Sequence, residues 1–111
     1  MHDIVEVAVG LPIPKTFHYR IPEKMKDSLQ VGMRVLVPFK GRKVTGFTLD
    51  LPERPPEGIE SSLLNVEDLL DQIPLIDAGM LRFYRWISDY YIYPLGEVIK
   101  TGLPPGLHLK S

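Results

Sequence analysis

Short segments in which apolar and polar residues alternate fill the first half of the chain, and prolines and glycines separate them. Successive side chains of a β-strand point to opposite faces of a sheet, so this period of two predicts strands. Pro12 and Pro14 exclude a helix between the first two segments and favour extended backbone there. The predicted strands span residues 4–9, 17–21, 33–39 and 44–51. Strands this short, joined by tight turns, are typical of a small, curled antiparallel sheet or barrel.

The second half of the chain begins with an ambiguous segment and ends in helices. Residues 63–70 fit either a helical turn or a strand, and we expect a further strand that helps to close the sheet. Asp77 is a plausible helix N-cap, and residues 78–91 carry apolar side chains at helical spacing. A second, short helix is expected at residues 97–101. The predicted apolar face of the first helix consists of Met80, Phe83, Tyr84, Ile87 and Tyr91.

These elements predict a mostly β fold with appended helices. A small antiparallel β-barrel-like sheet is followed by one amphipathic helix and a short C-terminal helix. The 111 residues suit one domain, which we place at residues 1–106. The barrel is expected at about residues 1–72 and the helical part at about 77–102. Residues 107–111 are typical of the start of a linker.

Composition narrows the class of protein. There is no cysteine, which excludes disulfides, thiolate zinc sites and a cysteine nucleophile, and suits a reducing cytoplasm. We expect no signal peptide at the polar start, and no apolar run approaches the roughly 20 residues of a membrane span. Residues 1–51 carry eight Lys and Arg against five Asp and Glu (+3), whereas residues 52–111 carry five against nine (−4). The basic front half suits an anionic partner, while the acidic back half argues against a surface wrapped by duplex DNA.

Familiar catalytic patterns are missing from the sequence. The run from Gly41 to Thr48 approaches a phosphate-binding P-loop, but Phe47 stands where the motif needs the lysine that reaches the β and γ phosphates. The three histidines lack zinc-ligand spacing, and no serine lies in a nucleophile-elbow pattern. We therefore expect no catalytic residue, metal site or cofactor in this chain. A hydrolase site assembled from carboxylates distant in the sequence stays open as an alternative.

The segment from residue 12 to residue 20 is the most informative candidate for binding. Alternation along a strand places Phe17 and Tyr19 on one face and His18 on the other. Either aromatic belongs to the core, or it offers a stacking face to a nucleic-acid base. In the second case, His18 is placed to hydrogen-bond a sugar hydroxyl or a base edge.

A second candidate is the predicted hairpin tip made of Lys40, Gly41, Arg42 and Lys43. It holds three cations in four residues, and the glycine supplies a positive φ angle. It is either a solvated turn or a contact for phosphates, which a glycine backbone N–H can approach closely. Four aromatic residues near the end of the main helix are expected mostly in the core or in the seam between helix and sheet. They are Trp86, Tyr90, Tyr91 and Tyr93.

Three blocks of this sequence together resemble the N-terminal DNA 3′-end-binding domain of the PriA replication-restart helicases. The first runs through Leu-Pro-Ile-Pro-Lys-Thr-Phe-His-Tyr to Ile21-Pro22, and the second is Val-Gly-Met-Arg-Val-Leu-Val-Pro-Phe. The third runs from Trp86 through Pro-Leu-Gly-Glu-Val to Leu-Pro-Pro-Gly. Each block alone is unspecific, but their order and spacing cover nearly the whole chain.

The resemblance implies recognition of the 3′ end of the nascent leading strand at stalled or repaired replication forks. Members of the family form the 3′-end pocket from a Thr-Phe-Asp-Tyr segment, a glycine after Val-Pro-Phe and a lysine further on. Phe17 and Tyr19 match this pattern, whereas His18 stands in place of the acid and Lys40 precedes Gly41 in place of the glycine. The lysine falls near Leu64, so that contact is missing here or comes from Arg42 or Lys43.

The resemblance also implies a longer protein, an ATP-dependent 3′→5′ DNA helicase whose ATP and zinc sites lie outside this chain. The expected partners are DNA with a free 3′ end and, through the full-length protein, other primosome proteins and single-stranded-DNA-binding protein. No membrane partner is expected, and the expected location is the bacterial cytoplasm at the nucleoid. The alternative is a protein-interaction β-barrel that docks a partner through the arm at Pro12 and Pro14.

Overall fold

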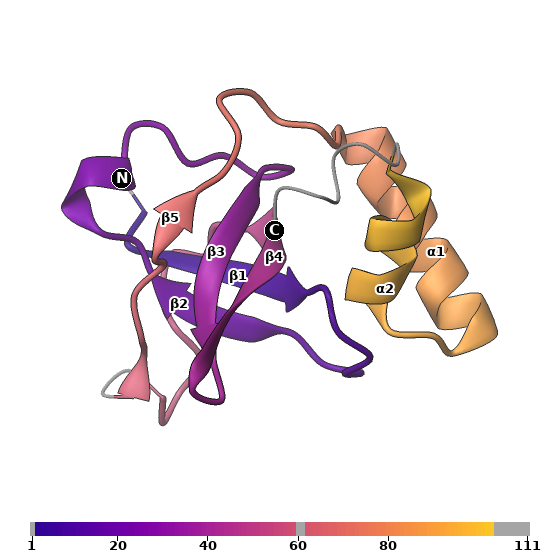
Figure 1. Cartoon of the computed structure of the whole chain (residues 1–111), viewed down its shortest axis with the longest axis horizontal. Helices are drawn as coiled ribbons and strands as arrows, with labels where there is room; N and C mark the ends of the chain where they lie inside the picture. The colour runs from indigo at the N-terminus through magenta and orange to yellow at the C-terminus, as the bar shows by residue number, and fades with distance from the viewer. Residues whose placement is uncertain (1, 60–61, 104–111) are drawn as a thin grey trace.

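The computed structural model describes residues 2–59 and 62–103, and within them the chain forms five strands followed by two α-helices (Figure 1). The expected linker at residues 107–111 lies outside the described residues. The mostly β fold with appended helices is confirmed. The strands are β1 (Ile4–Val9), β2 (Phe17–Arg20), β3 (Arg34–Phe39), β4 (Arg42–Asp50) and β5 (Asp68–Leu69). A 3₁₀ helix, η1 (Glu23–Met25), follows β2, and the helices are α1 (Ala78–Tyr91) and α2 (Leu95–Gly102).

The strands form one antiparallel sheet in the order β2-β1-β4-β3-β5. The sheet is not closed into a barrel, because β2 and β5 lie at its two edges. It curls until a single parallel bridge joins Arg20 of β2 to Asn65, just before β5. The ambiguous segment at residues 63–70 therefore does contribute a strand, although β5 itself has only two residues.

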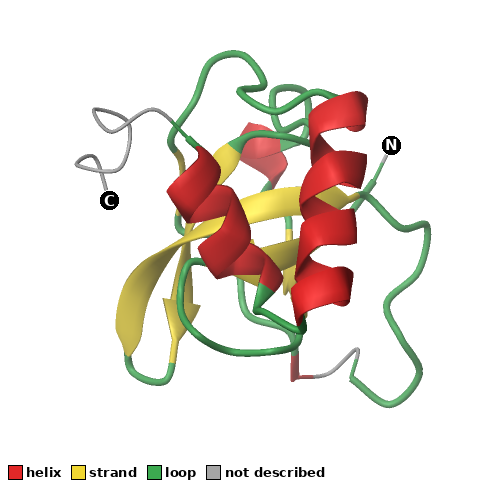
Figure 2. Cartoon of the chain, turned by 90° about the vertical axis from the view of Figure 1, so that its right-hand side faces the viewer, coloured by secondary structure: helices red, strands yellow, loops and turns green. Residues whose placement is uncertain are grey.

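Two hydrophobic clusters hold the fold together. Inside the curl of the sheet, the valines of β1 and β3 pack against Tyr19, Phe39 and Val66. On the outer face, Phe47 and Leu49 of β4 pack against residues of both helices. The alternation along β4 divides its side chains between the two clusters, as a period of two requires. Figures 1 and 2 show the helices side by side, together covering one side of the sheet.

The contact between α2 and the sheet depends on a glycine. A Cβ atom added at Gly96 would lie 1.7 Å from the carbonyl oxygen of Val9, so only glycine lets the helix approach β1 this closely. Val98 and Ile99 are then buried in the outer cluster.

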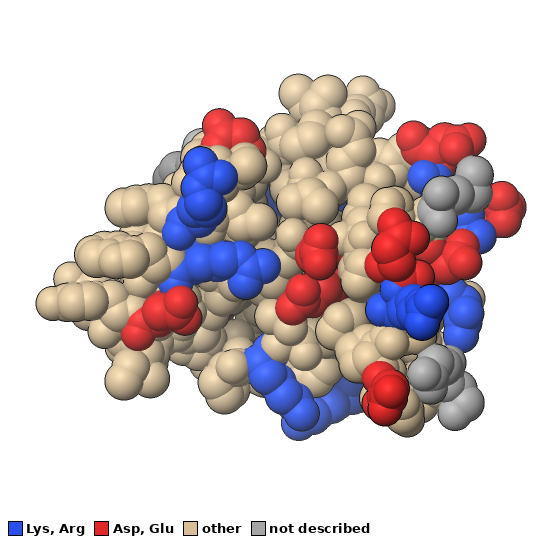
Figure 3. Space-filling model, turned by 180° about the vertical axis from the view of Figure 1, so that it is seen from behind, with Lys and Arg blue, Asp and Glu red and all other residues tan. Residues whose placement is uncertain are grey.

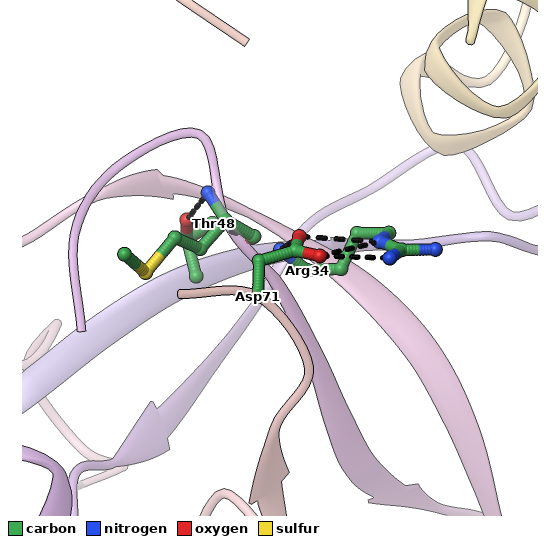
Figure 4. A network of polar contacts seen from close by, with 4 residues as sticks. Arg34, Thr48 and Asp71 are labelled. Atoms are coloured by element: carbon green, nitrogen blue, oxygen red, sulfur yellow. Dashed lines mark hydrogen bonds and ion pairs between the residues drawn. The ribbon is translucent and has the colours of Figure 1, made fainter. Parts of the chain in front are cut away.

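A buried ion pair joins the start of β3 to the chain just after the edge strand β5. The Arg34 guanidinium donates to both carboxylate oxygens of Asp71 at 2.7–3.2 Å, and the two side chains are each 6% exposed (Figure 4). Asp71 also accepts from the Arg34 backbone N–H at 2.8 Å. Nearby, the Thr48 hydroxyl accepts from the N–H of Met33 at 2.9 Å. Bidentate pairs of this kind fix geometry, so they hold the chain after β5 against β3.

The prediction for α1 was right in its bounds and only partly right in its buried face. Asp77 caps the helix by accepting from the Met80 N–H at 2.8 Å. The buried residues of the helix are Leu81 and Tyr84, and Ile87 is partly buried beside them. Tyr84 and Ile87 were predicted to be buried, whereas Leu81 was not. Most of the residues expected in the core are exposed, because one short helix rests on the sheet along a narrow strip. They are Met80, Phe83, Trp86, Tyr90, Tyr91 and Tyr93.

Candidate nucleic-acid interface

An open hollow of about 500 Å³ lies where β2 separates from the segment that leads into β5. The Arg20 N–H donates to the carbonyl of Leu64, and the Val66 N–H donates to the carbonyl of Arg20. This pairing is an isolated bridge. Toward the start of β2 the two segments leave space, and residues 15–19, 38–40, 59 and 62–64 line it. The curl of the sheet therefore brings the candidate segment of β2 and the end of β3 to one place.

Three of the predicted site residues enter this hollow from β2, with different degrees of burial. Phe17 is half-buried, and its ring packs edge-on against Phe39 with ring centres 4.9 Å apart. Tyr19 is only 4% exposed, and its hydroxyl donates to the Pro38 carbonyl at 2.8 Å. Its ring therefore belongs to the core and supports the floor of the hollow. His18 is half-buried.

The backbone of His18 faces the same side as that of Arg20. Backbone N–H and C=O groups alternate in direction along a strand paired on one side. Both groups of Arg20 point away from β1, toward Leu64 and Val66. Two residues earlier, the N–H and C=O of His18 therefore also point away from β1, toward the hollow. An edge strand thus presents hydrogen-bonding groups that depend on no particular side chain.

The β3–β4 hairpin turns more tightly than the sequence predicted. Its turn consists of Lys40 and Gly41 alone, with φ angles of 49° and 79°, and Arg42 already pairs with Phe39. Positive φ at both central residues is the pattern of the turns that best connect twisted strands. Lys40 lines the hollow beside β2. Arg42 and Lys43 instead line a second hollow, so the predicted tip divides between two places.

The first hollow is basic. The Nζ of Lys15 lies 5.5 Å from the centre of the Phe17 ring. The Nζ of Lys40 lies at the same distance, 5.5 Å, from the centre of the Phe39 ring. No carboxylate is among the described residues that line it. Thr16 is already engaged, because its hydroxyl donates to Glu6 at 2.6 Å. On the face seen in Figure 3, basic side chains lie in separate groups with acidic ones between them, which is unlike a continuous track for duplex DNA.

Sequence reasoning missed two contributions to the hollow. Lys15 belongs to the informative segment but was not among the predicted site residues, although its position next to Thr16 could have pointed to it. Ile59 and Leu63 come from a loop far from β2 in the sequence, and no local pattern marks them. Leu64, where the resemblance places the missing lysine, also lines the hollow.

Other kinds of site find no support in the described residues. The run from Gly41 to Thr48 enters β4 directly, whereas a P-loop needs a loop before a helix. Residues 2–59 and 62–103 hold no group of three or more His, Cys, Asp or Glu that could bind a metal ion. Within the same ranges, neither helix has the length and apolar character needed to cross a membrane.

Comparison with known proteins decides the family. Residues 6–104 match the model of the PriA 3′DNA-binding domain (3′BD). The chain belongs to the PriA 3′DNA-binding domain family. It is 37% identical over 101 residues to the replication restart protein PriA of Haemophilus influenzae, and 34% identical over 98 residues to that of Bacillus subtilis. These matches cover 91% and 88% of this chain but 13% and 12% of the two relatives. The family resemblance inferred from the three sequence blocks is confirmed.

Proposed function

We propose that this chain binds the free 3′ end of a DNA strand in the hollow beside β2. The observation that carries the proposal is the convergence of the family's pocket positions. Phe17, His18, Tyr19, Lys40 and Leu64 come from three separate segments and line one space. The family to which the chain belongs is described as a 3′DNA-binding domain, which supports DNA as the ligand.

Each side of the hollow suits one part of a terminal nucleotide. The accessible part of the Phe17 ring offers an apolar surface to the last base, a contact of the kind worth about 1–3 kcal/mol. Lys15 and Lys40 are placed to contact the phosphate groups. His18 supplies its imidazole and its outward backbone groups to the 3′-hydroxyl. A neutral imidazole offers one donor and one acceptor, so it replaces an acid without removing the acceptor.

The test compares strands that differ only at their ends. A single strand ending in a 3′-hydroxyl should bind more tightly than the same strand ending in a 3′-phosphate. Equal binding of the two strands contradicts the proposal. His18→Ala should fold normally, because this half-buried side chain belongs to neither hydrophobic cluster. It should lose the discrimination between the two strands, because it removes the imidazole from the hollow.

A matched pair of lysines separates local from general charge effects. Lys40→Ala should weaken binding of both strands, because it removes a cation from the hollow. Lys24→Ala removes an exposed lysine that lines none of the hollows described above and should leave binding unchanged. If His18→Ala keeps full discrimination, the hydroxyl is read elsewhere, and the backbone at Lys40 and Gly41 is the next candidate.

We propose further that the chain performs this task as part of a longer bacterial replication restart protein. ATP hydrolysis, helicase activity, zinc binding and contacts with other primosome proteins or single-stranded-DNA-binding protein would then belong to that protein. The same proposal places it in the cytoplasm, at the nucleoid. The isolated chain should hydrolyse no ATP with or without DNA, which a phosphate-release assay measures.

The alternative, docking of a protein through the proline arm, has one supporting observation. Pro12 and Pro14 are exposed, while Ile13 between them packs toward the inner cluster. Substituting both prolines by alanine should leave DNA binding unchanged if the hollow is the functional site. Loss of DNA binding in that variant with a normal melting temperature would instead assign the arm a direct role.

A further inference from the structure

A second basic hollow lies on the outer side of the β3–β4 hairpin, beside the end of α2. Its described lining includes Arg34, Arg42, Lys43 and Lys100 and contains no Asp or Glu. These cations come from β3, β4 and α2, so only the packing of α2 on the sheet brings them together. The aliphatic part of the Lys100 side chain lies beside Gly10, the residue after β1. Its Cδ is 3.8 Å from the point that a Cβ atom on Gly10 would occupy.

The four cations are not equally available to a ligand. Arg34 is held by its buried bidentate pair with Asp71. Lys43 forms an ion pair with Glu67 at 3.0 Å, which is largely exposed and therefore weak. Arg42 and Lys100 are exposed, and neither has an ion pair with another described residue. No described carboxylate therefore neutralises these two charges at the rim of the hollow.

The floor of the hollow adds a polar group without a partner. The hydroxyl oxygen of Thr45 is buried and has no hydrogen-bond partner among residues 2–59 and 62–103. Buried polar groups are normally hydrogen-bonded, and leaving one without a partner destabilises the folded protein. Thr45 is one of the residues that line the hollow, so its hydroxyl is a candidate donor to an acceptor bound there.

We infer that this second hollow binds a backbone phosphate of the same DNA whose 3′ end enters the first hollow. The inference rests on the proposed function and extends it. The two-residue turn at Lys40 and Gly41 separates the two hollows, with Lys40 on one side and Arg42 and Lys43 on the other. A strand that ends beside β2 can thus continue past the turn, where Arg42 and Lys100 meet a phosphodiester group.

Lys100 also has an ordinary structural explanation, which the test must separate from phosphate binding. Lys100 lies in the last turn of α2, where a cation interacts favourably with the helix dipole. That contribution affects stability and is independent of DNA. The decisive measurement is therefore the salt dependence of DNA binding, with melting temperature recorded for every variant.

The experiment uses a single strand of about 12 nucleotides, within the range of about 4–16 nucleotides that one OB fold covers on single-stranded nucleic acid. Affinity is measured between low and moderate salt for the wild type, Lys100→Ala and Arg42→Ala, with Lys24→Ala as the control. Each phosphate contact contributes about 0.7 to the slope of log affinity against log salt. Losing one contact should thus reduce the steepness of this slope by about 0.7. It should also weaken the affinity about five-fold near 0.1 M salt. Lys24→Ala should change neither quantity.

The 3′-end dependence distinguishes this inference from the proposed function. Lys100→Ala should weaken strands with a 3′-hydroxyl and a 3′-phosphate by the same factor. An unchanged salt slope in Lys100→Ala and Arg42→Ala overturns the inference, and so does an altered ratio between the two strands. If the wild type does not distinguish the two ends, the proposed function fails, whereas a lowered slope in Lys100→Ala still supports a phosphate contact here.

Discussion

Replacing Tyr19 by phenylalanine tests whether this residue is structural or reads the DNA directly. The ring is 4% exposed, and its hydroxyl donates to the Pro38 carbonyl at 2.8 Å. Phenylalanine keeps the ring but removes that bond, which is worth about 1 kcal/mol. For a domain of this size, 1 kcal/mol lowers the melting temperature by about 4–8 °C. We therefore expect a measurably less stable protein that still folds.

The same substitution should leave DNA binding intact. The hydroxyl of Tyr19 is occupied by a backbone carbonyl, so a ligand in the hollow does not need it. Binding is measured well below the melting temperature with strands ending in a 3′-hydroxyl and in a 3′-phosphate. A variant with unchanged stability and weakened 3′-hydroxyl binding would refute the structural role. Tyr19→Ala is less informative, because losing a buried ring costs about 3–5 kcal/mol and endangers folding.

Alkaline pH gives an independent measure of the burial of Tyr19. Burial raises the pKa of its phenol above the usual 10.0. The folded state therefore favours the neutral phenol over the phenolate. The stability that the neutral phenol contributes is fully present below pH 10.0 and is lost as the pH rises through the folded-state pKa. The phenylalanine variant lacks this titration. The stability difference between the two proteins should therefore narrow above pH 10.0, as thermal melts across that range would show.

Three further substitutions test the packing. Gly96→Ala would place a Cβ 1.7 Å from the Val9 carbonyl oxygen, so α2 must move, and urea unfolding should show a loss of about 1–3 kcal/mol. Asp71→Ala leaves the buried Arg34 guanidinium without its carboxylate, so the free energy of unfolding should fall by about 3–5 kcal/mol in the same assay. A fall of under about 1 kcal/mol would mean that the pair is not buried in solution. Trp86→Ala should change stability by no more than about 0.5 kcal/mol, because the ring is 57% exposed, and a large loss would show that another surface covers it.

Local sequence patterns determined much of the secondary structure. Alternation placed four strands close to their final bounds, and Asp77 with helical spacing placed α1 at residues 78–91. Gly41 marked the hairpin turn, since a positive φ is far easier for glycine than for other residues. These features depend on residues close together in the chain, so the sequence alone can reveal them.

The sequence did not determine which apolar residues are buried on the helices. Leu81 and Tyr84 face the sheet, while Phe83, Trp86 and Tyr90 face solvent. An aromatic-rich helix offers several apolar faces of similar character, and periodicity cannot choose among them. The choice follows from the line along which α1 meets β4 and α2. Exposed aromatics are also common enough on protein surfaces that composition gives no warning.

The candidate site divides in the same way. The segment at residues 12–20 could be singled out from the sequence, because its aromatic, polar and cationic residues are contiguous. Only the curl of the sheet shows that Tyr19 is core, that residues 59 and 62–64 form the opposite wall, and that Arg42 lies apart from Lys40. Lys100 joins Arg42 solely because Gly96 lets α2 pack directly on β1. Contacts between distant segments depend on how whole elements pack, which no local pattern encodes.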